Sequence, residues 1–220
     1  EAEQALRQAL AERERLQREF LGAASHELRA PITSVMGYSE LLADGLGGAL
    51  GPLQAQYVRA IQKGVRRMHR LVDDMLDFAS LESGAFVFAP QAIDVGAIAA
   101  DELAACEPSA QERGVSLTLA LPTGPVPARA DPGRIGQVLA NLIGNALKYT
   151  PAGGHVAVSV AREAGLVRVA VRDDGIGVAA EHLPHLFEKH FRVDPSATRA
   201  LGGSGLGLAI CRALIEAHGG

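Results

Sequence analysis

Over residues 1–84, hydrophobic side chains recur at alternating steps of three and four, the spacing that predicts helices with one buried stripe. The first stretch covers residues 1–44 and opens with a segment rich in Glu, Arg and Gln, which is typical of a coiled-coil lead-in. The second stretch begins at Pro52 and ends near Gly84. The glycine-rich segment 44–52 between them predicts a loop, so we expect the two helices to form a hairpin.

Each predicted helix carries one apolar seam. A lone hairpin leaves such seams half covered, so we expect two copies to pair as a homodimer that forms a four-helix bundle. The expected seam residues are Leu21, Ala24, Leu28, Pro31, Val35, Tyr38 and Leu42 in the first helix, and Val58, Ile61, Val65, Met68, Val72, Met75 and Ala79 in the second.

After residue 84 the pattern changes to shorter elements, which predict helices packed on one face of a largely antiparallel sheet. The fold class is therefore α+β, with a coiled-coil lead-in and helical hairpin over 1–84 and an α/β sandwich over 85–220. We expect the last strands of that sandwich to lie beyond residue 220. The predicted strands cover residues 86–88, 115–121, 155–160 and 166–171, and the predicted helices cover 94–112, 132–149 and 205–218.

Composition narrows the function classes. The formal net charge of -4 and the scattered Lys and Arg residues argue against nucleic acid as the main partner. The two cysteines, Cys106 and Cys211, lie far apart in apolar surroundings without metal-ligand spacing, which indicates reduced thiols. No apolar run is long enough for a membrane span, so we expect this segment to be cytoplasmic and free of membrane contact.

The heptapeptide SHELRAP is the first candidate for chemistry. His26 lies two residues from the expected seam residues Ala24 and Leu28, which turns its imidazole toward solvent. Pro31 lacks an N–H and crowds the carbonyl of Glu27, so a bend is expected after the His-Glu pair. A neutral imidazole is a nucleophile, and Glu27 can stabilise the positive charge that attack creates. A surface histidine without a chemical role would give the same pattern.

The predicted helix 132–149 has an apolar face and an opposite polar stripe. Asn is a poorer helix former than Glu or Lys, so two mid-helix asparagines indicate a ligand. An amide oxygen suits a hard Mg²⁺ that bridges phosphates, and a lysine supplies complementary charge. An ordinary amphipathic helix is the alternative interpretation. The stripe consists of Arg134, Gln137, Asn141, Asn145 and Lys148.

Three further signals are weak when taken one at a time. A strand runs into Asp173, whose carboxylate can accept from the exocyclic amine of adenine, and Gly175 and Gly177 allow close backbone approach. The glycine-rich segment 202–208 opens the last helix and can bind phosphate, although many such runs are plain loops. The segment 187–192 contains two phenylalanines, which indicate either a movable lid or a small satellite core.

The order of these segments resembles the sensor histidine kinases of two-component systems. SHELRAPIT resembles their H box, and NLIGNALKYT, DDGIG, FEKHFR and GGSGLGLAI resemble the N, G1, F and G2 boxes of their Bergerat-type ATPase domain. The resemblance extends over nearly the whole chain. It implies a dimerisation and phosphoacceptor hairpin followed by an ATP-binding catalytic domain.

The resemblance also implies roles for residues. His26 would take the γ-phosphoryl group of ATP with assistance from Glu27, and Asn145 would ligate Mg²⁺. Tyr149 would lie against adenine, and Asp173 would recognise its amine. The implied nucleotide-binding residues are Asn141, Asn145, Lys148, Tyr149, Asp173, Gly175, Gly177, Arg192, Gly203, Gly205, Leu206 and Gly207.

The implied partners are a response regulator, whose receiver aspartate takes the phosphoryl group, and an upstream sensor domain in the full-length protein, which could anchor it in a membrane. In the family, the fourth residue after the histidine is often Thr or Asn, which positions a water for dephosphorylating the regulator. Here that residue is Ala30, so we expect weak regulator-phosphatase activity.

Two other function classes remain open. One is a non-kinase ATPase of the same Bergerat type, although such proteins lack a histidine-bearing hairpin before the ATP domain. The other is a catalytically silent scaffold that binds ATP and a partner. The presence of His26, Asn145 and Asp173 argues against a silent module.

Overall fold

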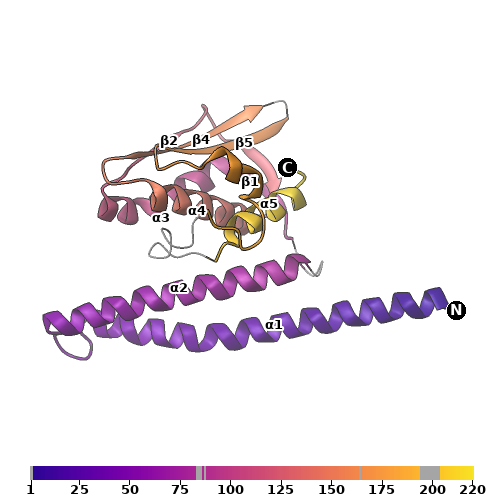
Figure 1. The fold of residues 1–220 in the computed structure, drawn as a ribbon, viewed down its shortest axis with the longest axis horizontal. Helices are drawn as coiled ribbons and strands as arrows, with labels where there is room; N and C mark the ends of the chain where they lie inside the picture. The colour runs from indigo at the N-terminus through magenta and orange to yellow at the C-terminus, as the bar shows by residue number, and fades with distance from the viewer. Residues whose placement is uncertain (1, 83–85, 87, 164, 194–203) are drawn as a thin grey trace. The chain divides into compact units, whose positions relative to one another are not determined.

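The computed structural model describes residues 2–82, 86, 88–163, 165–193 and 204–220, and within the first helix several side chains lie outside this description. By its internal contacts the chain divides into two compact units, Glu1–Phe86 and Val87–Gly220, and each is described by itself. The first unit is a helical hairpin and the second is a mixed α/β unit (Figure 1).

The hairpin consists of helices α1 (Ala2–Ala43) and α2 (Pro52–Glu82), which lie side by side and run in opposite directions (Figure 1). Gly45 and Gly48 in the connecting turn have φ angles of 80° and 98°, which a residue with a Cβ rarely adopts. Helix α1 continues without interruption through Pro31, and the expected bend there stays a prediction.

The side chains of α1 that α2 covers are not those of the predicted seam. Among the described side chains of this helix, the buried ones are Ile32 and Ser39, which are 7% and 4% exposed. Pro31 and Tyr38, which the sequence placed in the seam, are exposed. Leu28, Val35 and Leu42 of the predicted seam are exposed as well, so the burial of this seam by a second copy stays a prediction, while α2 covers the neighbouring flank that contains Ile32 and Ser39.

The apolar stripe of α2 also has one covered flank and one exposed flank. Val58 and Val65 are buried as predicted, whereas Ile61, Met68 and Met75 are 47%, 52% and 67% exposed in the single chain. These three residues lie at heptad spacing, so they form a continuous band beside the covered one. We call the exposed band of both helices the uncovered apolar stripe. It consists of Leu28, Val35, Tyr38, Leu42, Ile61, Met68 and Met75.

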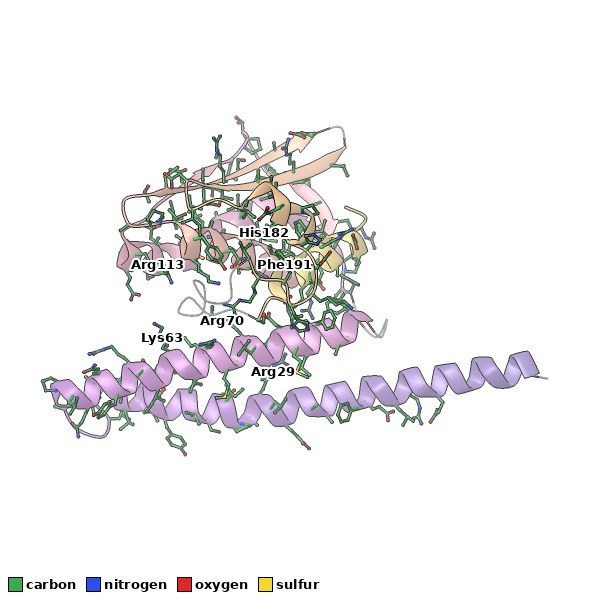
Figure 2. All side chains as sticks on the ribbon, in the orientation of Figure 1. Arg29, Lys63, Arg70, Arg113, His182 and Phe191 are labelled. Carbon is green, nitrogen blue, oxygen red and sulfur yellow. The ribbon has the colours of Figure 1, made fainter. Side chains whose placement is uncertain are left out.

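Polar contacts also join the two helices. The Arg29 guanidinium of α1 contacts the Asp73 carboxylate of α2 at 2.9 Å, and His69 Nδ1 lies 2.8 Å from the other oxygen of that carboxylate. Figure 2 shows Arg29 between α1 and α2. Gln62 Nε2 donates to the carbonyl oxygen of Ser39 at 3.2 Å. These contacts fix the pairing of α1 with α2.

The second unit places helices against a three-stranded sheet (Figure 1). In that sheet β4 lies between β2, with which it runs parallel, and β5, with which it runs antiparallel. Strands β1 and β3 form a separate antiparallel pair. The elements are β1 (Gln91–Asp94), α3 (Val95–Arg113), β2 (Ser116–Ala120), β3 (Pro127–Ala130), α4 (Pro132–Tyr149), β4 (His155–Glu163), β5 (Leu166–Asp173), the 3-10 helix η1 (Ala180–His185) and α5 (Gly207–Ala217).

The core of this unit lies between α3, α4 and one face of the β2–β4–β5 sheet. Ile143 of α4 is fully buried, and Val156 and Val158 of β4 are exposed by no more than 1%. This arrangement confirms the α+β class and the helices on one sheet face. The strand predicted at 86–88 is wrong at Phe86 and Phe88, which lie outside any strand, and Val87 lies outside the described residues. Strand β3 was missed because it follows a Pro-rich turn.

Candidate functional site

The candidate nucleophile lies on the long helix of the hairpin. The backbone of His26 is part of α1, but its side chain lies outside the described residues, so its expected orientation stays a prediction. The neighbouring Glu27 is exposed.

Helix α4 carries most of the expected nucleotide-binding residues. Asp131 caps it, with Oδ1 accepting from the Arg134 N–H at 3.2 Å, and Pro132 occupies the first turn. Its apolar side is buried in the core, and the polar stripe on the other side is half-buried. Asn145 Nδ2 donates to Asn141 Oδ1 at 3.1 Å, so the two amides are aligned one helical turn apart.

The end of α4 meets the loop after β5. The Gly175 N–H donates to Asp173 Oδ1 at 3.0 Å, and the Ile176 N–H donates to the Tyr149 carbonyl oxygen at 3.2 Å. A Cβ at Gly175 would lie 2.6 Å from that same oxygen, so only glycine fits there. Gly177 has a φ of 67°. The exposed Asp173 carboxylate is thereby held beside Tyr149, with acceptor capacity left for a ligand amine.

The start of α5 meets the middle of α4. A Cβ at Gly207 would lie 2.5 Å from Asn141 Nδ2, so the missing side chain lets the first turn of α5 approach the asparagine. Gly205 has a φ of 71°, and its carbonyl oxygen accepts from the His190 N–H at 2.9 Å. Leu206 is buried and anchors this end of α5. Gly203 lies outside the described residues.

The phenylalanine-bearing segment forms its own small cluster. The Phe191 ring packs against His182 and His185, with ring centroids 5.8 and 5.6 Å apart, and Figure 2 shows His182 and Phe191 close together. Phe187 is 44% exposed. Arg192 is half-buried. Part of the segment therefore packs locally, in agreement with the satellite-core interpretation, while Phe187 remains accessible.

Lys148 follows Asn145 by three residues at the end of the polar stripe, next to Tyr149. Its Nζ donates to the Tyr149 hydroxyl at 2.8 Å and lies 4.5 Å from the centre of that ring. The cation is thus held at the end of the polar stripe.

Sequence reasoning missed two residues near this site. Thr150 Oγ1 is buried and has no hydrogen-bond partner in the part of the chain that the structure describes. Such a hydroxyl costs about 1–3 kcal/mol unless something satisfies it, and ordered water is the usual solution. Asp174 Oδ1 accepts from the His155 N–H at 2.7 Å and ties β5 to β4. Both roles depend on long-range packing, which a local motif does not reveal.

Together these contacts assemble three sequence segments around α4. The amide pair presents the Asn145 Oδ1 atom, a hard oxygen of the type that Mg²⁺ binds, and the lysine offers positive charge for phosphate. The carboxylate of Asp173 suits an amine donor. The chemistry of the donor set fits a magnesium-bound nucleotide.

The chain matches known protein families. Residues 16–84 match the His Kinase A (phospho-acceptor) domain family, and residues 130–220 match the family described as histidine kinase-, DNA gyrase B-, and HSP90-like ATPase. Sensor histidine kinase WalK of Bacillus subtilis is 37% identical over 92% of this chain and 33% of its own length. Signal transduction histidine-protein kinase BaeS of Escherichia coli is 32% identical over 98% of this chain and 45% of its own. The chain therefore spans less than half of either relative.

Solved structures agree. Full-length ShkA in complex with AMPPNP superposes with a TM-score of 0.70 and 34% identity, over 91% of this chain and 41% of that one. The Acinetobacter baumannii histidine kinase AdeS superposes with a TM-score of 0.58 and 27% identity, over 87% of this chain and 86% of that one.

Within the described residues, no helix has the length and apolar character that a membrane crossing requires.

Proposed function

This chain belongs to the sensor histidine kinases and carries their phosphoacceptor and ATP-binding domains, and from that premise we propose that it phosphorylates its own His26 with ATP and passes the phosphoryl group to a response regulator. The observation that carries the proposal is the joining of three candidate nucleotide-binding segments around α4, in one chain with a histidine-bearing hairpin. A gyrase-like or HSP90-like ATPase needs no such hairpin.

The exposure around position 26 supports a reactive histidine. Residues three and four positions away on a helix are its surface neighbours, and here these are Gly22, Ala23, Arg29 and Ala30. All four are exposed in the single chain. The neighbours of position 26 on α1 are therefore accessible, and attack on a nucleotide held by another unit requires an accessible histidine.

In the proposed reaction an imidazole nitrogen of His26 attacks the γ-phosphorus of ATP in line, forming a P–N bond as the bond to the β-phosphate oxygen breaks. ADP leaves, and Glu27 stabilises the positive imidazole that attack creates. The protein contributes mainly positioning and charge. Asn145, supported by Asn141, would hold Mg²⁺, which supplies neutralising charge to the phosphates when bound. Lys148 adds a second positive charge.

We assign adenine recognition to the C-terminal end of α4 and the adjacent end of β5. Asp173 accepts from the exocyclic amine, and Tyr149 lies against the ring. Gly175 and Gly177 let the backbone approach, while Gly203, Gly205, Leu206 and Gly207 shape the phosphate end of the site and Arg192 reaches toward the phosphates. These assignments rest on the resemblance in motif order and on the contacts that hold Asp173 beside Tyr149 and Gly207 against Asn141.

Incubation with γ-labelled ATP tests this function against its alternatives. A kinase gives a protein-bound label that is labile in acid and stable in base, as expected for phosphohistidine. A non-kinase ATPase releases labelled phosphate without labelling the chain, and a silent scaffold binds ATP and does neither. Either of the latter results would contradict the proposal.

The uncovered apolar stripe is assigned to a homodimer. Its residues repeat at heptad spacing on both helices, and a second hairpin would bury them in a four-helix bundle. We expect the double substitution Ile61→Glu and Met68→Glu to weaken dimerisation at least about a hundredfold, because it would bury unpaired carboxylates. Light scattering of the purified chain measures the effect.

Lys63→Glu is the matched control for the dimer test. It also changes the net charge by two, but Lys63 is exposed on α2 outside the stripe, on its charged side (Figure 2). We expect this variant to keep the mass of a dimer. A double variant that also remains dimeric would show that the stripe is not the interface.

The response regulator is the proposed acceptor of the phosphoryl group. We propose that the residue at position 30, here Ala30, determines how fast the chain then dephosphorylates the regulator. Alanine has no group that can orient a water, and Ala30 is exposed one turn from His26. We therefore expect slow dephosphorylation of the regulator, and an increase of about tenfold in Ala30→Thr if water positioning is the missing element. Loss of label from the purified phosphorylated regulator measures the rate.

Ala23→Thr adds the same hydroxyl to another exposed position of α1 and serves as the control. It should leave the dephosphorylation rate unchanged. Rapid dephosphorylation by the unaltered chain would overturn the assignment of Ala30.

A further inference from the structure

The segment that enters the α/β unit from the hairpin is held at its start by two residues from distant helix ends. The Ala89 N–H donates to Asp131 Oδ2 at 3.1 Å, and the Phe88 ring lies edge-on to the His218 imidazole, with centroids 5.0 Å apart. The Asp131 N–H in turn donates to His218 Nε2 at 3.1 Å. We call Phe88, Asp131 and His218 the linker clasp.

The imidazole of His218 is fixed at both nitrogens. Nδ1 lies 2.7 Å from the Leu214 carbonyl oxygen, which can only accept, so Nδ1 carries the hydrogen. Nε2 is then the acceptor that the Asp131 N–H requires. One neutral tautomer satisfies both contacts, and His218 thereby joins the end of α5 to the start of α4.

Asp131 serves two structures with one carboxylate. Its Oδ1 caps α4 through the Arg134 N–H, and its Oδ2 holds the linker through the Ala89 N–H. Burial alone raises the pKa of Asp131, but the N–H donors of Ala89, Arg134 and Gly133 outweigh it, and the pKa is lowered from its ordinary value. The carboxylate therefore stays charged at neutral pH and keeps all its donors.

The two helices that meet at the clasp both lead to the candidate nucleotide site. Asp131 precedes Asn141 by ten residues, a distance of about 15 Å along α4. Helix α5 runs from Gly207, which lies against Asn141, to its C-cap His218, beside Asp131. The clasp thus lies at one end of the α4–α5 pair, and Asn141 and Gly207 meet toward the other.

We propose that Phe88, Asp131 and His218 are positioning residues that attach the linker, at residues 88 and 89, rigidly to the α4–α5 pair. Movement of the hairpin is thereby transmitted to α4, the helix that carries the candidate nucleotide-binding residues. This inference rests on the proposed kinase function. Without the clasp, residues 88–90 would be free to move relative to α4 and α5, and His26 would meet the nucleotide less often in the reactive geometry. Nucleotide affinity would not change, because no clasp residue touches the candidate site.

The test compares two substitutions of His218 in the full chain. His218→Leu removes the acceptor, whereas His218→Gln places an amide oxygen near the position of Nε2. We expect His218→Leu to lower the rate of His26 phosphorylation about tenfold with nucleotide affinity within about twofold, and His218→Gln to restore much of the rate. A parallel loss of rate and affinity, or no loss of rate, would overturn the proposal.

A second pair of variants tests the clasp at residue 89, outside α5, so that a folding defect in α5 does not affect the result. Ala89→Pro removes the N–H that Asp131 accepts, and Ala89→Ser keeps it. Residue 89 already precedes Pro90, which favours an extended backbone that proline tolerates. We expect the Pro variant to reproduce the slow phosphorylation of His218→Leu and the Ser variant to behave as the unaltered chain; equal rates in the two would contradict the clasp.

Amide hydrogen exchange separates failure of the clasp from failure of the kinase function. The clasp predicts faster exchange of the Ala89 amide in His218→Leu than in His218→Gln, whether or not His26 takes a label. Unchanged exchange in His218→Leu would overturn the clasp. An unaltered chain that takes no label contradicts the proposed function, and the exchange result then decides the clasp alone.

Discussion

His26→Gln should abolish labelling of the chain by γ-labelled ATP, with a fall of more than about a thousandfold, because removal of a nucleophile leaves no group to form the covalent bond. Glutamine is polar and fits a helix, so the hairpin should remain intact. Scintillation counting of the protein band after neutral gel electrophoresis measures the loss, and a nucleotide-binding titration should show unchanged affinity.

His69→Gln is the control for this substitution. His69 also lies on the hairpin, where its Nδ1 is 2.8 Å from Asp73, but it belongs to α2 and has no role in the proposed reaction. It should keep the label. Equal labelling of the His26 variant and the unaltered chain would place the phosphoryl group on another residue and would remove the basis of the proposed mechanism.

Asp173→Asn should weaken binding of ATP roughly ten- to hundredfold, which corresponds to the loss of a hydrogen bond to a charged acceptor, about 1.5–3 kcal/mol. The amide oxygen can still accept from the Gly175 N–H, so the loop should keep its conformation. A titration with a fluorescent adenine nucleotide measures the affinity. The loss should be much smaller for GTP, because guanine has an oxygen where adenine has its amine.

The adjacent carboxylate provides a matched control. Asp174 Oδ1 accepts from the backbone N–H of His155, a contact that an amide oxygen can also make. Asp174→Asn should therefore leave ATP affinity unchanged. If both variants lose affinity equally, or if neither does, the assignment of Asp173 to the adenine amine is wrong.

Local sequence patterns predicted the helices and strands well where the ends of an element depend only on nearby residues. Helix α4 is an example, because the cap at Asp131, the proline after it and the separation of apolar from polar residues are all local. The spacing in α1 and α2 also predicted two paired helices. It did not tell which flank of each stripe the other helix of the same chain covers: Ile32 and Ser39 are buried, whereas the predicted seam residue Val35 is exposed in the single chain.

The missed features depend on residues far apart in the sequence. The pairings of β1 with β3 and of β4 with β5 are antiparallel, as expected, but β2 and β4 pair in parallel across α4, which alternation alone does not reveal. The contact of His218 with Asp131 joins residues separated by 87 positions. The candidate site was accessible from the sequence because its motifs are contiguous, whereas the packing of Gly207 on Asn141 needed the structure.

The central claim is that one chain supplies both a phosphoacceptor histidine and the nucleotide site that serves it. Mass spectrometry of the chain after incubation with ATP, with digestion and separation at neutral pH to preserve a P–N bond, tests that claim most directly. We expect phosphorylation of the peptide that contains residues 22–30, with the phosphoryl group on His26. A phosphoryl group on a serine, threonine or aspartate, or an unmodified chain that has nevertheless consumed ATP, would contradict it.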